Sequence, residues 1–184
     1  VMLFLLAAGL TLIFGIMGVI NLAHGSLYMI GAFIGTFVAV QSGMFWLGLP
    51  VAILAAMVVG IALELGIMRK LYQRDHLDQV LATFSLILIF NELTVLTFGR
   101  QPVFTQLPAS LSQPVELFEG LSYPPFRLMI IAAGLLVAVG LYLFINRTRI
   151  GMLVRAGSTN RDMVRALGVD IRLLYTLVFA LGAA

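Results

Sequence analysis

The 184-residue sequence lacks cysteine altogether, and only 10% of its residues are charged. Without cysteine the chain has no disulfide scaffold, no thiol nucleophile and no thiolate metal site. Its only two histidines, His24 and His76, lie far apart in the sequence, and no Gly-rich phosphate loop of the Walker type is present. A soluble domain carries about 25% charged residues. The sequence therefore excludes a soluble enzyme, and it predicts no ATP hydrolysis by this chain, no metal and no cofactor.

Apolar residues are what the sequence has in excess. They make up 61% of it, and the mean hydropathy is +1.09. No charged side chain precedes Glu64, and this stretch alone is long enough for about three membrane crossings of about 20 residues each. The apolar runs are continuous, which favours helices over a membrane barrel. We therefore expect one all-α, polytopic transmembrane helical bundle over residues 1–184.

The apolar runs predict about five complete spans and a truncated sixth. The chain starts with Val1 and ends at Ala184 inside an apolar run, so we expect a fragment that is cut at both ends. The stretches Gln41-Ser42-Gly43 and Gly48-Leu49-Pro50 predict a short turn zone between the second and third spans. The expected spans cover residues 1–20, 26–40, 51–68, 80–98, 128–145 and 173–184.

Three connections between the runs differ in chemistry. Residues 69–79 carry three Lys or Arg, and residues 146–172 carry six arginines. The positive-inside rule places both in the cytoplasm, and two spans separate them, so they can lie on one side. Residues 99–126, with five of the six prolines, then form an extracytoplasmic loop. The net charge of +3 is gathered at these connections, so we expect a lipid bilayer and no nucleic acid as partner.

Small residues at helical spacing predict where the helices touch. Close backbone approach supplies much of the attraction between helices in lipid, and glycine or alanine permits it. Gly31-x-x-x-Gly35 and Ala56-x-x-x-Gly60 fit that pattern. We expect both motifs at helix interfaces.

A polar break interrupts the first 40 residues. Asn21, His24 and Gly25 fall between two apolar runs. Irregular backbone at membrane depth is tolerated only where it is buried in protein or faces a water-filled cavity. One interpretation is therefore a break that lines a passage. The other is a short turn at the membrane interface in which His24 caps a helix end.

Two glutamates, Glu92 and Glu64, also lie within apolar runs. Asn91 and Glu92 lie near the middle of the fourth run, where a carboxylate costs about 2.5–3.5 kcal/mol on insertion scales. One interpretation is a helix that faces the bundle interior or a water-filled path. The other is that the Glu92 carboxyl group is protonated, or is paired with a neighbouring helix for packing alone. Glu64 lies near the cytoplasmic end of its run, so we expect it to reach interfacial water or Arg69 and to be structural.

The segment 146–172 predicts a short amphipathic helix. Thr159, followed three positions later by Asp162, resembles a capping box, and Gly168 suits a helix stop. Between them lies a helix of about eight residues, with arginines on one face and apolar residues on another. Asp170 is placed to cap the next span. Such a helix lies on anionic lipid or docks in a groove of a cytoplasmic partner, and the residues alone leave both open.

Three stretches of the sequence together carry a family resemblance. The most specific is Asn21-Leu-Ala-His24-Gly25 with the glycines around it. The second runs from Leu63-Glu64 through Arg69-Lys70-Leu-Tyr72 to Leu81-Ala-Thr83. The third runs from Arg149-Ile-Gly151 to Ala166-Leu-Gly168-Val169 and on to Phe179-Ala-Leu-Gly182-Ala-Ala184. With these stretches the chain resembles the permease subunits of branched-chain amino acid ABC importers.

The resemblance implies a function and partners. A pair of homologous permeases would form the pathway in a bacterial-type plasma membrane, with two cytoplasmic ATPase subunits and an extracytoplasmic solute-binding protein, which the 99–126 loop would contact. The helix near residues 159–168 would be the coupling helix that enters an ATPase groove. The alternatives are a sister ABC permease for a sugar or urea, or an ion-coupled transporter that uses Glu92. The predicted path residues are Asn21, His24, Gly25, Asn91 and Glu92, and the predicted coupling residues are Arg155, Arg161, Met163, Arg165, Leu167 and Gly168.

Overall fold

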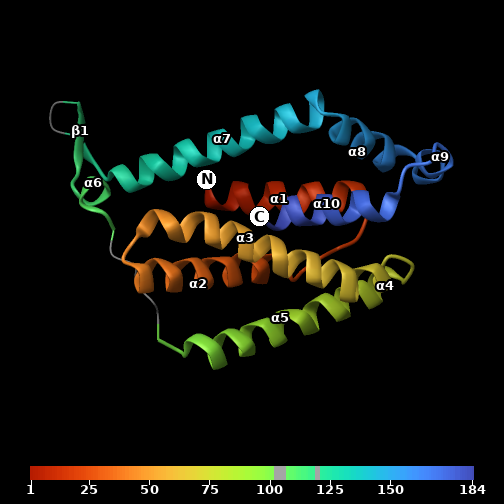
Figure 1. Cartoon of the computed structure of the whole chain (residues 1–184), viewed down its shortest axis with the longest axis horizontal. Helices are drawn as coiled ribbons and strands as arrows, with labels where there is room; N and C mark the ends of the chain where they lie inside the picture. Colours follow the sequence, from red (N-terminus) through yellow and green to blue (C-terminus); the bar gives the residue numbers. More distant parts are fainter. Residues whose placement is uncertain (102–106, 119–120) are drawn as a thin grey trace.

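The computed structural model describes residues 1–101, 107–118 and 121–184, and helices account for most of them. The long helices run roughly along one direction and form an elongated bundle (Figure 1). The elements in chain order are α1 (Met2–Met17), α2 (His24–Ser42), α3 (Phe45–Leu63), the π-helical turn η1 (Glu64–Met68), α4 (Arg69–Leu71), α5 (His76–Phe98), α6 (Ala109–Ser112), β1 (Val115–Phe118), β2 (Leu121–Tyr123), α7 (Pro125–Arg147), α8 (Arg149–Thr159), α9 (Arg161–Ala166) and α10 (Ile171–Ala183).

Both basic connections lie at the same end of the bundle. The α4 segment and the helices α8 and α9 gather at one end, whereas α6 and β1 lie at the other (Figure 1). Two long helices, α5 (His76–Phe98) and α7 (Pro125–Arg147), separate the two basic connections, as the sequence predicts. The assignment of the basic end to the cytoplasm stays a prediction that depends on the positive-inside rule.

Four helices of the described chain are long and apolar enough to cross a membrane: His24–Ser42, Phe45–Leu71, His76–Phe98 and Pro125–Arg147. Met2–Met17 and Ile171–Ala183 are shorter apolar helices of 16 and 13 residues. The first run was expected to continue to residue 20. It ends earlier because Gly18 adopts the left-handed conformation, with φ 61°, and its N–H bonds the Phe14 carbonyl at 2.8 Å.

Helices α2 and α3 pack backbone against backbone. A Cβ atom added to Gly35 would lie 2.7 Å from the Gly48 carbonyl oxygen, and one added to Gly31 would lie 3.1 Å from that of Ala52. Only glycine permits this approach at these positions. Further along α3, a Cβ added to Gly60 would lie 2.7 Å from that of Ala183 in α10. Both small-residue motifs are therefore confirmed as helix interfaces.

The predicted turn zone is confirmed at its first part, where Gly43 ends α2 with φ 67°, but it is wrong at residues 48–50. Helix α3 begins at Phe45 and continues through Pro50. Proline lacks the N–H that would bond the carbonyl of Trp46 four residues earlier, so the helix loses one hydrogen bond near its start. The packing of Gly48 against Gly35 keeps this turn helical.

The centre of the bundle is formed by α1 and α10, which run antiparallel (Figure 1). Ile13, Val178 and Phe179 are completely buried there. An added Cβ at Gly9 would collide with the carbonyl oxygen of Gly182, so the two helices cross through glycines. Helix α7 lies at the outside, and only a small share of it is buried.

The proline-rich segment is more structured than the expected loop. Its described residues form the short helix α6 and an antiparallel pair of strands, with Val115 opposite Tyr123. Its proposed contact with a binding protein stays a prediction.

Candidate permeation and coupling sites

The Asn21–Gly25 break lies on a connection that turns back into the bundle. After α1 ends at the basic end, residues 18–23 return inward, and α2 starts well inside the bundle (Figure 1). Val19, Asn21 and Ala23 are buried along this return. The Asn21 side-chain oxygen accepts a hydrogen bond from the Ala23 N–H at 3.1 Å, which forms a tight Asx turn before the helix.

The His24 ring shows how deep the break lies. Its Nε2 atom faces Gly9 of α1, and it makes a backbone hydrogen bond with Leu6. Gly9 precedes Met17, the last residue of α1, by eight positions, which is about 12 Å along the helix at 1.5 Å per residue. The hydrocarbon core of a bilayer is about 30 Å thick. The ring thus lies about 12 Å along α1 from the end of that helix, and the depth of the break in the membrane stays a prediction.

Two polar atoms at the break have no hydrogen-bond partner among the described residues. They are the Asn21 Nδ2 and His24 Nδ1 atoms, and both are buried. A buried unpaired group costs about 1–3 kcal/mol, so water, a solute or another conformation has to supply its partner. Gly25 is exposed next to them, and an added Cβ there would meet open space. These features suit a segment that changes its contacts as it works.

The structure does not bring Asn91 and Glu92 to the break. Both are exposed on α5, and the packed face of this helix instead carries Gln79, Thr83 and Thr94. The end of α5 holds α2 through the ring of Phe98, whose centroid lies 5.3 Å from that of Phe33. A path role for Asn91 and Glu92 stays a prediction.

The basic segment contains two helices where one was expected. Helix α8 fills residues 149–159 and is capped by Thr148, whose hydroxyl accepts a hydrogen bond from Gly151 N–H at 3.0 Å. The Thr159 cap is wrong, because its hydroxyl bonds back to the Arg155 carbonyl at the end of α8. Asn160 caps α9 instead, accepting from the Met163 N–H at 3.0 Å.

Helix α9 has six residues rather than about eight. Gly168 follows it with φ 83°, a conformation that suits a helix stop, and Asp170 caps α10 as predicted, through bonds from the N–H groups of Arg172 and Leu173. Met163 and Leu167 are 64% and 75% exposed, whereas Val164 is buried. The helix therefore packs through Val164 and presents two apolar side chains outward.

The arginines of this segment are only partly accounted for by internal contacts. Arg155 donates a hydrogen bond to the Asn146 side-chain oxygen at 2.8 Å, which joins α8 to the end of α7. Arg165 is exposed on α9. The side chain of Arg161 lies outside the described residues. The coupling role of this surface stays a prediction.

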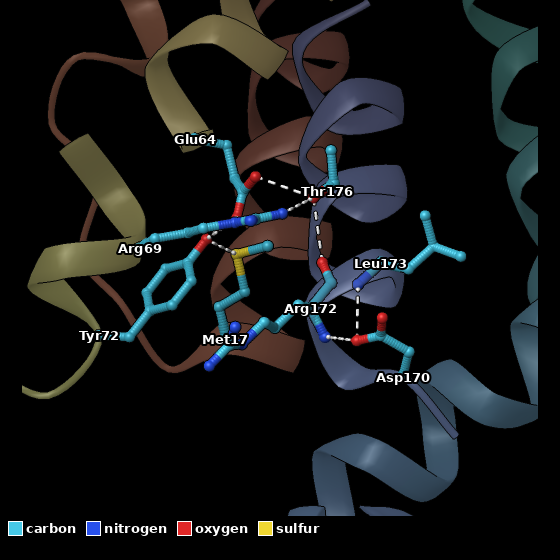
Figure 2. Close-up of polar contacts among 8 residues, drawn as sticks. All are labelled: Met17, Glu64, Arg69, Tyr72, Asp170, Arg172, Leu173 and Thr176. Carbon is cyan, nitrogen blue, oxygen red and sulfur yellow. Dashed lines mark hydrogen bonds and ion pairs between the residues drawn. The ribbon is translucent and has the colours of Figure 1, made fainter. Parts of the chain in front are cut away.

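A buried polar cluster at the basic end is built around Glu64. Of the two expected contacts of Glu64, interfacial water or Arg69, the one with Arg69 is confirmed. The sequence interpretation missed that the side chain is completely buried and also bonds Tyr72 and Thr176. Its Oε1 atom accepts from Arg69 Nε and from the Tyr72 hydroxyl, both at 3.1 Å, and its Oε2 atom accepts from the Thr176 hydroxyl at 2.8 Å (Figure 2). We call Glu64, Arg69, Tyr72 and Thr176 the Glu64 cluster.

The π-helical turn makes the ion pair of this cluster possible. Five residues along an α-helix end up about 140° apart around the axis, because each residue turns about 100°. The turn η1 has the wider i to i+5 repeat, and it starts at Glu64. Arg69 is therefore brought above Glu64. The i, i+5 spacing of opposite charges was the signal available in the sequence, whereas nothing there marked Thr176.

Tyr72 connects the cluster to α1 and makes a second contact with α10. Its hydroxyl lies 3.7 Å from the Met17 sulfur of α1, and its ring lies edge-on to that of Tyr175 in α10, with centroids 5.4 Å apart. Burial, reinforced by the Glu64 carboxylate, raises the pKa of Tyr72. The phenol therefore stays neutral and remains a hydrogen-bond donor at physiological pH.

No group of three or more acidic, histidine or cysteine side chains within the described ranges could hold a metal ion. The fold, the buried break and the basic end together define a multi-pass helical membrane protein.

Comparison with known proteins identifies the family. The chain belongs to the family described as the permease component of branched-chain amino acid transport systems, whose model matches residues 1–184. No solved structure matches this chain significantly.

Several curated proteins are similar over nearly the whole chain. BraD of Pseudomonas aeruginosa, named a high-affinity branched-chain amino acid transport system permease protein, is 28% identical over 98% of this chain and 62% of its own length. LivH of Escherichia coli K12, with the same description, is 27% identical over the same shares. A probable LivH of Methanocaldococcus jannaschii is 27% identical over 92% of this chain and 55% of its own. The chain thus spans somewhat more than half the length of these relatives.

Proposed function

We propose that this chain is part of the membrane-spanning permease subunit of an ATP-driven importer for branched-chain or related amino acids. The names of the three relatives support amino acids over a sugar or urea as the cargo. The observation that supports the proposal is the break at Asn21–His24, where buried polar atoms without a partner among the described residues lie between two apolar helices. This chain would conduct the solute and perform no bond chemistry.

The basic end supports docking of ATPase subunits. Met163 and Leu167 project from α9, and Arg165 adds charge to the same short helix. An exposed apolar pair with flanking cations suits a groove on a cytoplasmic protein better than a purely lipid-facing position. A second homologous permease, two ATPase subunits, an extracytoplasmic binding protein and a bacterial-type plasma membrane complete the proposal.

The function is tested by transport of the full-length protein. It would be expressed with the subunits that purify with it, reconstituted in vesicles, and assayed for uptake of labelled leucine with and without ATP. Excess isoleucine should compete, whereas ribose and urea should not. Uptake that follows an ion gradient without ATP, and that is lost in Glu92→Gln, would instead identify an ion-coupled transporter.

Docking through α9 is tested by charge reversal. In the double variant Arg161→Glu with Arg165→Glu, we expect ATP hydrolysis to lose its coupling to uptake while the complex still inserts, because like charges would oppose the partner surface. The matched control is Arg127→Glu, an exposed arginine at the start of α7 and at the other end of the bundle. Unchanged uptake in the double variant would contradict the docking proposal.

A further inference from the structure

We propose that the Glu64 cluster transmits movement of α9 to the helix pair α2–α3, so that Thr176 and Glu64 act as positioning residues in coupling. The inference rests on the proposed function, since it needs a partner that moves α9. It is supported by a continuous series of short contacts from α9 to the Asn21–His24 break.

The first step runs from α9 to α10. Only Leu167–Asp170 separate the two helices, and Asp170 fixes the start of α10 by accepting hydrogen bonds from Arg172 N–H at 2.9 Å and from Leu173 N–H at 3.3 Å. A capped helix that follows so short a connection shifts with the segment before it. A displacement of α9 therefore reaches the first turns of α10.

The second step joins α10 to the end of α3. Thr176 lies in these first turns, and its hydroxyl accepts from Arg69 Nη2 at 2.9 Å while it donates to Glu64 (Figure 2). The hydroxyl has one proton and two acceptors within reach, Glu64 Oε2 at 2.8 Å and the Arg172 carbonyl at 3.0 Å. Donation to Glu64 links α10 to the end of α3, whereas donation to the Arg172 carbonyl keeps this bond inside α10 and leaves the link to the bond from Arg69. We expect the hydroxyl to exchange these two acceptors when α10 moves.

The turn η1 places the contact between Thr176 and Glu64 at a point where the helix can change its backbone hydrogen bonding. π-Helical turns occur as single turns inside α-helices, often at functional sites. Here the turn holds the acidic end of the ion pair, and the buried carboxylate of Glu64 depends on donors from outside α3. A change in those donors changes the charge balance of a completely buried group, which costs far more than a change at the surface.

The third step runs from α3 to the break. Gly31 and Gly35 of α2 fit against Ala52 and Gly48 of α3 without room for a side chain between them. Such tightly packed helices move together. Since α2 begins at His24, movement of α3 shifts the residue whose ring lies against Gly9 of α1.

Thr176→Val tests the inference, because it replaces the hydroxyl with a methyl group of similar size. In the full-length protein with its ATPase subunits, we expect assembly and ATP hydrolysis to persist while uptake per ATP falls about fivefold or more, the lower range of an allosteric coupling. Thr176→Ser should restore the ratio, since it keeps the hydroxyl. The control is Thr97→Val, which removes a hydroxyl that bonds only the Leu93 carbonyl on an exposed part of α5.

The outcomes separate this inference from the proposed function. Wild-type protein without ATP-dependent uptake would overturn the function itself. Wild-type uptake per ATP in an assembled Thr176→Val complex would overturn the coupling role alone. If Thr176→Val fails to assemble, Tyr72→Phe removes another donor to Glu64 but keeps the ring against Tyr175. An unchanged ratio in Tyr72→Phe would then overturn the role.

Discussion

A single buried carboxylate organises the basic end of this bundle. An isolated charge in an apolar interior costs several kcal/mol, and Glu64 offsets this with a guanidinium and two hydroxyl donors. Those donors come from α4, the turn after it and α10, so one side chain holds segments that are more than a hundred residues apart. The charge is tolerated only while this set of donors is complete.

Removal of the cation should therefore be costly. In Arg69→Met, the Glu64 carboxylate stays buried without its ion-pair partner, and we expect a loss of about 3–5 kcal/mol of stability. Thermal unfolding of the full-length protein in mild detergent measures it. The control is Lys70→Met, which changes the exposed residue next to Arg69. It should alter the free energy of unfolding by less than about 0.5 kcal/mol. Equal stability of the two variants would show that the ion pair contributes nothing.

At the scale of helices, composition and spacing predicted most of what is observed. The apolar runs located the long helices because a span has to be continuous, and Gly31, Gly35 and Gly60 lie at the interfaces that their spacing suggested. The turn at Gly48–Pro50 was wrong because tertiary packing overrode a local helix breaker. The cap at Asn160 was missed because neighbouring Thr159 is also a capping residue and has an acidic residue three positions later, as in a capping box.

The α2–α3 contact offers a direct test of this packing. In Gly35→Val, the new side chain would meet the Gly48 carbonyl and the Ala52 side chain, so we expect a loss of about 1–3 kcal/mol from overpacking. The melting temperature in detergent measures it. Gly140→Val on α7 is the matched control, because a Cβ there meets open space. A Gly35→Val protein as stable as this control would mean that the helices do not approach so closely.

For the whole molecule, charge distribution predicted which segments share an end, but not the path of the chain between them. The alternation of basic and proline-rich connections is a property of the sequence. The inward return of residues 18–23 is not, because its Asn and Gly residues also suit an interfacial turn. The contact between Glu64 and Thr176 likewise joins segments whose separation leaves no local pattern.

The orientation can be measured because these 184 residues contain no cysteine. Three single-cysteine variants at exposed positions are suitable: Gln73→Cys, Ser158→Cys and Gln113→Cys. The first two positions lie after α4 and in α8, at the basic end, and the third follows α6, at the other end (Figure 1). A membrane-impermeant maleimide added to intact cells should label Gln113→Cys alone. The other two should react only after the cells are opened. Labelling of all three from one side would contradict the predicted topology.

The crossing of α1 and α10 through Gly9 and Gly182 also bears on how the protein is made. These glycines are 173 positions apart, so at about 5–20 residues per second the ribosome needs about 9–35 s to synthesise the second after the first. Throughout that interval α1 is in the bilayer or its insertion machinery with its glycine face uncovered. Arrival of α10 covers this face, so the contact closes only after all the helices between the two have been made.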